Sequence, residues 1–128
     1  MQKLSALKIF YPLETWKDNH ILRAWGEPIT KITPEILEFA AILMELMREY
    51  DGVGLAAPQI GKNLAMIATT QRKKMPSWKS ADKDFLWETL LINPKILESS
   101  KETQISEEAC LSLPGEQGKV ERQERIVV

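Results

Sequence analysis

The chain has 128 residues, of which 44% are hydrophobic and 27% charged, as expected for a globular protein of one domain. Its formal net charge of −1 argues against nucleic acid or an anionic membrane as the main partner. The sequence shows no apolar run of membrane-spanning length and no signal-peptide pattern, and its single cysteine cannot form an intramolecular disulfide. These features predict a single domain, residues 1–128, in the cytoplasm.

The clearest predicted element is a helix over residues 34–50. Thr33 is a favourable N-cap, and Pro34 falls at the first helical position, where its missing N–H costs nothing. Apolar residues recur at spacings of three and four and so share one face: Ile36, Ala40, Leu43, Met44 and Met47. Gly52 is a natural stop just past the end of this helix.

Beyond Gly52 the pattern changes to short strands. They are predicted at residues 64–68, 90–92, 96–97, 103–106 and 125–128, with turns at Gly115 and Gly118. Residues 71–88 are charged and irregular, so they predict an exposed loop or hairpin excursion. One long helix with several strands on no regular βαβ schedule predicts an α+β fold, with mostly antiparallel strands around one main helix.

The last residues of the chain, Ile126-Val127-Val128, are all apolar and β-branched. Domains more often finish in polar, frayed residues, and a strand that simply stops leaves an open edge. One interpretation is a terminal strand that is packed. We favour the other, in which more chain normally follows and the domain is C-terminally truncated.

Residues 52–61 form the most unusual stretch, because Gly52, Gly54 and two alanines leave little side-chain bulk. Gly52, Gly54 and Ala57 match the G-x-G-x-x-G/A pattern of dinucleotide-binding folds. That motif must follow a strand and open a helix, whereas this segment follows a helix, so we reject that interpretation. The segment would let the backbone approach a ligand closely, with the amide of Gln59 at the end of a constrained loop. A helix cap, a turn and a tight packing crossing explain the spacing equally well.

Residues 107–115 contain the only cysteine of the chain, Cys110. A lone cysteine is usually a small buried hydrophobe. A catalytic cysteine would need a histidine base, and nothing in the sequence brings the only histidine, His20, close to it. A metal-bound thiolate would need further ligands, and spacing reveals none. Taken alone, this segment leaves its role open.

Taken together, the two segments resemble the motifs of peptide deformylases. The stretch from Gly52 to Gln59 fits the family's first motif, G-x-G-x-A-A-P-Q. Residues 108–112 fit the second motif, E-G-C-L-S, except that Ala109 replaces its glycine. Residues 91–96 resemble the family's I-N-P segment in the expected place between them. Two long motifs in order are far more specific than either one.

This resemblance implies a metal-dependent hydrolase that removes the N-formyl group from N-formylmethionyl nascent polypeptides, with nascent chains and the ribosome as partners. Cys110 would bind the metal as a thiolate, with ferrous iron expected and zinc or nickel as replacements. Gln59 and the backbone N–H of Leu111 would donate to the formyl oxygen as it becomes an oxyanion. Gly54 would line the place of the substrate backbone, and Glu108 would support the loop by orienting its ligand and amide groups.

The resemblance covers about residues 20–128, which leaves residues 1–19 as an N-terminal extension and residues 71–88 as a variable loop. It does not include the family's third motif, H-E-x-x-H, because the only histidine of the chain is His20. That motif supplies two metal ligands and the general base. The 128 residues alone are therefore predicted to bind metal weakly and to be poorly active or inactive, with His20 a surface or loop residue.

Two functional hypotheses account for the absence of the H-E-x-x-H motif. The first is enzymatic, with H-E-x-x-H belonging to an absent C-terminal part or to a second chain of a split enzyme. The second is a non-catalytic, deformylase-like remnant that binds peptide N-termini or a partner chain. Coincidental motif matches in an unrelated α+β domain are the remaining interpretation.

Overall fold

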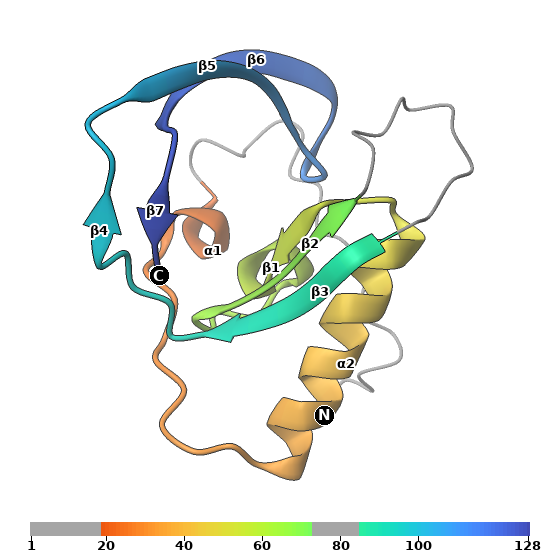
Figure 1. The fold of residues 1–128 in the computed structure, drawn as a ribbon. Coiled ribbons are helices and arrows are strands. Elements are labelled where there is room, and N and C mark those ends of the chain that lie inside the picture. Colours follow the sequence, from red (N-terminus) through yellow and green to blue (C-terminus); the bar gives the residue numbers. More distant parts are fainter. Residues whose placement is uncertain (1–18, 73–84) are drawn as a thin grey trace.

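The computed structural model describes residues 19–72 and 85–128, so residues 1–18 of the expected extension and 73–84 of the expected excursion lie outside it. The elements are shown in Figure 1: α1 (His20–Arg23), α2 (Pro34–Glu49), β1 (Gly54–Ala56), η2 (Ala57–Ile60), β2 (Met66–Arg72), β3 (Phe85–Ile92), β4 (Glu98–Ser99), β5 (Thr103–Cys110), β6 (Leu113–Gln123) and β7 (Ile126–Val127). All pairings between these strands are antiparallel, which confirms the predicted α+β class. No helix in the described ranges is long and apolar enough to cross a membrane.

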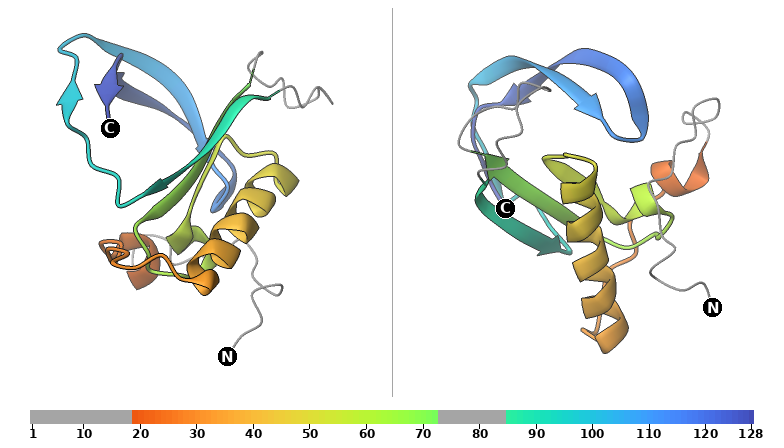
Figure 2. Two further views of the ribbon diagram at one scale, coloured as in Figure 1. Left: turned by 60° about the horizontal axis from the view of Figure 1, so that its bottom comes forward. Right: turned by 90° about the vertical axis from the view of Figure 1, so that its right-hand side faces the viewer.

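Helix α2 packs on the three-stranded sheet β1-β2-β3, and the core lies between them (Figure 2). The helix begins as predicted, since the Thr33 hydroxyl accepts a hydrogen bond from the N–H of Ile36 at 3.3 Å. The predicted apolar face is confirmed and is broader than expected. The buried side chains of the helix are Phe39, Ala40, Leu43, Leu46 and Met47, and those of the sheet are Leu55, Met66 and Ala68.

The end of α2 differs from the prediction that Gly52 would terminate it. Asp51 is the residue in the left-handed region, with φ 58°, and the N–H of Gly52 then bonds the carbonyl of Met47 at 2.9 Å. Aspartate tolerates this conformation better than most residues. Among the described glycines, positive φ occurs at Gly61 and Gly115, so Gly52 must be glycine for another reason.

Strands β2 and β3 form a hairpin that is longer than the sequence predicted. Pairing runs from Met66↔Ile92 to Arg72↔Phe85, so both ends of the expected excursion, residues 71–72 and 85–88, are strand. Side chains support this pairing: the Thr70 hydroxyl donates to the carbonyl of Trp87 at 2.7 Å, and the Trp87 indole donates to Gln71 at 2.7 Å. Of the two predicted possibilities, the loop was therefore wrong for these residues and the hairpin was correct, because cross-strand contacts outweigh a charged local composition.

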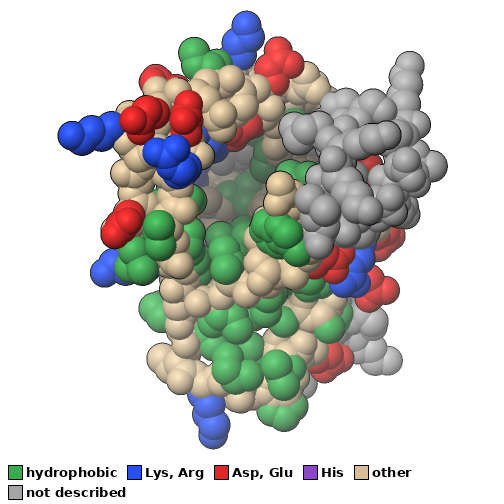
Figure 3. Space-filling model, in the orientation of Figure 1, with side chains coloured by type: hydrophobic (Ala, Val, Ile, Leu, Met, Phe, Trp, Pro, Cys, Tyr) green, Lys and Arg blue, Asp and Glu red, His purple; other side chains and the backbone are tan. Residues whose placement is uncertain are grey.

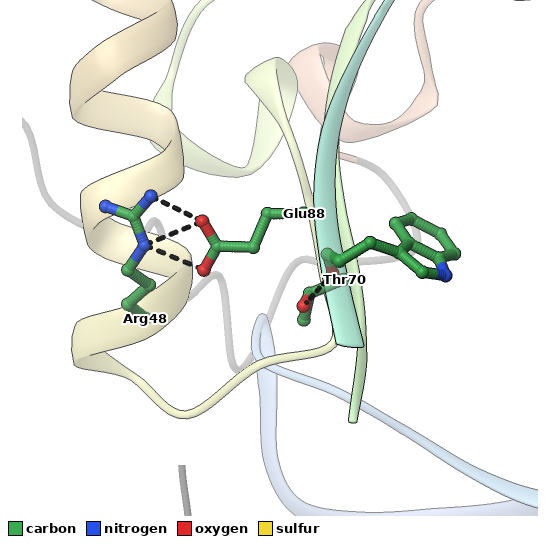
Figure 4. Close-up of polar contacts among 4 residues, drawn as sticks. Arg48, Thr70 and Glu88 are labelled. Atoms are coloured by element: carbon green, nitrogen blue, oxygen red, sulfur yellow. Dashed lines mark hydrogen bonds and ion pairs between the residues drawn. The ribbon is translucent and has the colours of Figure 1, made fainter. Parts of the chain in front are cut away.

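An ion pair joins α2 to the β2–β3 hairpin. Figure 4 shows the guanidinium of Arg48 facing the carboxylate of Glu88, with the Thr70 bond beside it. The Arg48 Nε lies 2.8 Å from Oε1 and 3.0 Å from Oε2 of Glu88. These hydrogen bonds hold the pKa of Glu88 below its ordinary value, although partial burial opposes them. The helix is thereby fixed to the sheet near its C-terminal end.

Asn93 ends β3 and holds a distant segment of chain. Its φ is 51°, and its N–H donates to the carbonyl of Ala65 at 2.8 Å. Its side chain pairs with the backbone of Ile29 as a strand would: Oδ1 accepts from the Ile29 N–H and Nδ2 donates to the Ile29 carbonyl, each at 2.8 Å. This pair of hydrogen bonds, together with the positive φ, explains why the residue is an asparagine.

Strands β5 and β6 form a hairpin that arches away from the core (Figure 1). In Figure 3 the surface is hollowed below it. The predicted strand 103–106 extends to Cys110, and Gly118 lies inside β6 opposite Glu108, so the predicted turn there was wrong. Gly115 has φ 79° where the pairing skips residues 114–116, but it also lies inside β6, so it marks an irregularity in the strand pairing and the predicted turn there was wrong too. Regular pairing between the two strands overrides the turn propensity of Gly118.

The last strand pair is short and exposed. Strand β4 is Glu98–Ser99 rather than the predicted 96–97, and β7 is Ile126–Val127 rather than 125–128. The N–H of Leu97 still donates to the carbonyl of Val127 at 2.8 Å. Five large apolar side chains of this region are about half or more exposed: Ile96, Leu97, Ile126, Val127 and Val128.

Candidate active site

Gln59 lies in the short helix η2, directly after the edge strand β1. Two neighbours of Gln59 anchor the helix because they are buried, Ala57 fully and Ile60 at 3% exposure. Gly61 ends it with φ 84°, and its N–H donates to the carbonyl of Pro58 at 3.0 Å. The first motif thus forms a rigid turn that holds Gln59 half-buried.

Hydrogen bonds fix which way the amide of Gln59 points. Its Oε1 accepts the backbone N–H of Ala56 at 2.9 Å, and this N–H is able only to donate. The Nε2 group must therefore face the opposite way. It lies 3.2 Å from the Ser112 hydroxyl oxygen and 3.6 Å from the sulfur of Cys110, the latter a weaker contact. An oriented amide donor consequently faces the second motif.

The second motif turns from β5 into β6 beside this amide. Cys110 is exposed, whereas Ser112 is buried at 3% exposure and Leu111 packs against the core. A Cβ atom on Gly52 would lie 2.8 Å from the Cδ1 of Leu111, closer than real Cβ contacts. The two motifs therefore touch at both the polar and the apolar side of this turn.

Gly54 pairs with Thr69 in β1, the edge strand of the sheet. A Cβ atom there would meet only the carbonyl oxygen of Ala68, at an ordinary 3.7 Å. The fold itself therefore does not require glycine at this position. A residue without a side chain on an edge strand leaves room for another backbone alongside.

Glu108 lies on β5 two residues before Cys110, but its carboxylate bonds across the hairpin. The Arg122 guanidinium donates to it twice, at 2.6 and 2.7 Å, and the Ser106 hydroxyl donates at 3.2 Å. The hydrogen bonds from Arg122 are the main reason that the pKa of Glu108 lies below its ordinary value. Glu108 thus braces the hairpin that presents Cys110.

The donor set for a metal ion is incomplete in this part of the chain. Within residues 19–72 and 85–128, no three His, Cys, Asp or Glu side chains lie together in a way that could hold a metal ion. Cys110 offers one sulfur ligand, and His20 is exposed at the start of α1. A catalytic metal ordinarily takes about three protein ligands, so these residues do not make a metal site on their own.

The structure gathers Gln59, Cys110, Leu111 and Ser112 at one place, with Gly54 on the adjoining strand. Sequence reasoning assigned no role to Ser112, although a small polar residue between two leucines was a signal that it faces something polar. It also missed the contact of Gly52 with Leu111, which no sequence signal reveals.

Comparisons with known proteins show which family the chain resembles. The family model described as polypeptide deformylase matches residues 11–128. A peptide deformylase from Desulforudis audaxviator is 39% identical over 108 residues, which cover 84% of this chain and 62% of that protein.

Two solved structures are also similar. The peptide deformylase of Thermotoga maritima has a TM-score of 0.75 at 31% identity, covering 94% of this chain and 69% of the other. The class I type b enzyme of Acinetobacter baumannii, with Met-Ala-Ser bound, has a TM-score of 0.77 at 29% identity, covering 94% and 72%. The chain spans 62% of the length of the curated relative from Desulforudis audaxviator. The chain belongs to the polypeptide deformylase family.

Proposed function

We propose that this chain provides the substrate-binding and oxyanion-stabilising part of a peptide deformylase, which removes the formyl group from N-formylmethionyl peptides. The observation that carries the proposal is the fixed amide of Gln59. Its Nε2 group faces Cys110 and Ser112 because the N–H of Ala56 occupies its oxygen. An amide held in this way stabilises negative charge without having to reorient during the reaction.

The formyl oxygen would accept hydrogen bonds from the Nε2 group of Gln59 and the backbone N–H of Leu111. Both donors belong to segments that are held by the core, so they stay in place during the reaction. Their hydrogen bonds to the formyl oxygen strengthen because that oxygen gains negative charge in the transition state. Removing one such donor typically lowers kcat by about 10²–10³-fold. Gly54 would let the substrate backbone lie along β1, and Glu108 would keep Cys110 in place through Arg122.

A metal would bind the thiolate of Cys110, with Fe²⁺ as the expected ion and Zn²⁺ or Ni²⁺ as replacements. When bound, such a metal supplies an activated water at neutral pH. Since the described residues contain no group able to hold a metal ion, the other ligands would come from elsewhere, in the same polypeptide or in a second chain. Nascent chains, at or near the ribosome in the cytoplasm, would be the natural substrates.

The incomplete donor set favours a second candidate function. A domain with an oriented amide and an open edge strand, but one metal ligand, is suited to bind formylated peptide N-termini without cleaving them. It would then act as a binding module, either alone or for a partner chain.

The test uses the ¹⁵N-labelled chain and two peptides, N-formyl-Met-Ala-Ser and Met-Ala-Ser, with Fe²⁺, Zn²⁺ or Ni²⁺ either added or omitted. We expect the formylated peptide to shift the amide signals of Gln59 and Leu111, and the unformylated peptide to shift them less. Gln59→Leu should abolish this difference, whereas Gln123→Leu, at an exposed glutamine of β6, should preserve it.

Formyl release with added metal would support the enzyme, and selective binding without release would support the binding module. Equal binding of both peptides by the wild-type chain would refute both functions. Retention of the discrimination by Gln59→Leu would refute the role of this amide.

A further inference from the structure

We propose that Gly52 is a positioning residue for the backbone N–H of Leu111, the proposed oxyanion donor, and that it acts through the Leu111 side chain. Gly52 and Gln59 belong to the first motif segment, and Leu111 and Ser112 to the second. The structure shows that glycine is needed at position 52 because space is limited there, and not because the backbone conformation requires it. The catalytic consequence of this inference rests on the proposed function, whereas the contact itself does not.

The space beside Gly52 is limited by one atom. A Cβ atom there would lie 2.8 Å from the Cδ1 of Leu111, while the carbonyl oxygens of Gly54 and Met47 would be at 3.5 and 3.6 Å, which are ordinary distances. The φ of Gly52 is outside the left-handed region. An ordinary side chain would therefore not strain the backbone here, and the steric demand for glycine comes from Leu111.

The identity of the clashing atom determines what a larger residue would do. Cδ1 is the end of a side chain, so it moves more readily than backbone would. Leu111 is partly buried against the core, however, so its side chain would meet core neighbours as it turns, and we expect part of the displacement to pass to its backbone. An added methyl group at Gly52 should thus leave the core folded and displace the turn from Cys110 to Ser112.

A second contact makes this displacement matter for the site. Gln59 bonds the buried hydroxyl of Ser112 at 3.2 Å, one residue beyond Leu111. The first motif therefore grips two consecutive residues of the turn, Leu111 by packing and Ser112 by a hydrogen bond. These two anchors hold Leu111 from its side chain and from the residue that follows, and the contact of Gln59 with the Cys110 sulfur holds the residue before it, so together they restrict rotation of the Cys110–Leu111 peptide group that carries the N–H.

The experiment compares ¹⁵N spectra and thermal melting of the wild-type chain with Gly52→Ala, Leu111→Val and the double variant Gly52→Ala/Leu111→Val. Valine lacks the Cδ1 atom and so removes the clash. Gly118→Ala is the matched control, because it adds the same methyl group inside β6 where no atom lies within 4 Å.

We expect Gly52→Ala to shift the Leu111 N–H and the Gln59 side-chain amide, and the double variant to return both signals towards those of Leu111→Val. Gly118→Ala should move neither. In any preparation that releases formate, Gly52→Ala should lower kcat by about 10²-fold, the effect of a misplacement of roughly 1 Å, with a smaller change in KM.

The proposal would be overturned if Gly52→Ala shifted the two signals no more than Gly118→Ala does. It would also be overturned if Gly52→Ala had the same effect on these signals in the Leu111→Val background as in the wild-type background. If Gly52→Ala fails to fold, restored folding in the double variant supports the coupling and continued failure overturns it. If the spectra behave as expected but the wild-type chain neither binds nor cleaves formylated peptide, the proposed function fails and the positioning contact stands.

Discussion

Asn93 should be one of the most sensitive polar positions in the fold. Its side chain makes two hydrogen bonds of 2.8 Å to the backbone of Ile29, and its φ of 51° disfavours most other residues. Ile29 belongs to the buried core, so its backbone groups are poorly placed to bond water instead. We therefore predict that Asn93→Ala lowers the free energy of unfolding by about 3 kcal/mol.

Three effects contribute to this value. Each lost hydrogen bond contributes about 1 kcal/mol net, and the left-handed conformation adds about 1 kcal/mol for alanine. Asn93→Gly separates the effects, because glycine accepts the conformation but lacks the bonds, so its loss should be about 2 kcal/mol. Asn93→Asp keeps the acceptor for the Ile29 N–H but replaces the donor by a second oxygen, which repels the carbonyl oxygen of Ile29. Its deficit should be larger at about pH 7 than at about pH 4, where a protonated carboxyl group is able to donate.

Urea unfolding followed by circular dichroism measures these differences. Asn63→Ala is a suitable control, because its Oδ1 is buried and has no hydrogen-bond partner among the described residues. Its effect should be smaller than that of Asn93→Ala. If Asn93→Ala and Asn93→Gly both unfold within about 0.5 kcal/mol of wild type, the paired bonds to Ile29 do not stabilise the fold as argued.

Three further predictions concern the site. Ser112→Ala should lower the free energy of unfolding by about 1 kcal/mol in urea titration and weaken formyl-peptide binding, because the Gln59 amide loses its hydrogen bond to Ser112 and keeps the one from Ala56; unchanged binding would contradict this. Since Arg122 lowers the pKa of Glu108, their pairing stabilises the fold above the ordinary pKa of 4.5 and is lost as the pH falls through the lowered value. On acidification the free energy of unfolding should therefore fall less for Glu108→Gln than for wild type, and the two decreases should differ by at most about 1 kcal/mol because the pair is exposed. If the urea midpoints of the two proteins fall by the same amount over that pH range, the pairing does not stabilise the fold as argued. After dialysis, metal analysis of the purified chain should find less than one ion per molecule, and stoichiometric retention would contradict an incomplete donor set.

The sequence predicted the parts of the fold that local rules determine. Helix α2 was predictable because Thr33, Pro34 and an apolar stripe act within one segment. Strand β6 was not, because its long pairing with β5 is a non-local contact that overrides the turn propensity of Gly118. The same reason explains the unexpected strand at residues 85–88, where Trp87 and Glu88 bond residues far away in sequence.

Most of the candidate site was predictable only as a set of residue types. The motifs identified Gln59 and Cys110, and the structure brings these two side chains within 3.6 Å of each other. Their catalytic roles and those of Gly54, Leu111 and Glu108 stay predictions. The orientation of the Gln59 amide depends on a backbone N–H, that of Ala56, and is invisible in the sequence.

The contacts between the two motifs explain why neither segment pointed to a function by itself. The first motif alone suited a helix cap and a turn, and the second alone suited a small buried residue. In the structure, Gly52 makes room for Leu111, and Gln59 joins the N–H of Ala56 to the hydroxyl of Ser112. Each motif thus satisfies a steric or polar requirement that the other creates. Ala109, the one departure from the second motif, is exposed and takes no part in these contacts. Replacing glycine by alanine there should therefore leave the amide and the turn in place, and any effect should fall on a ligand lying beside β5.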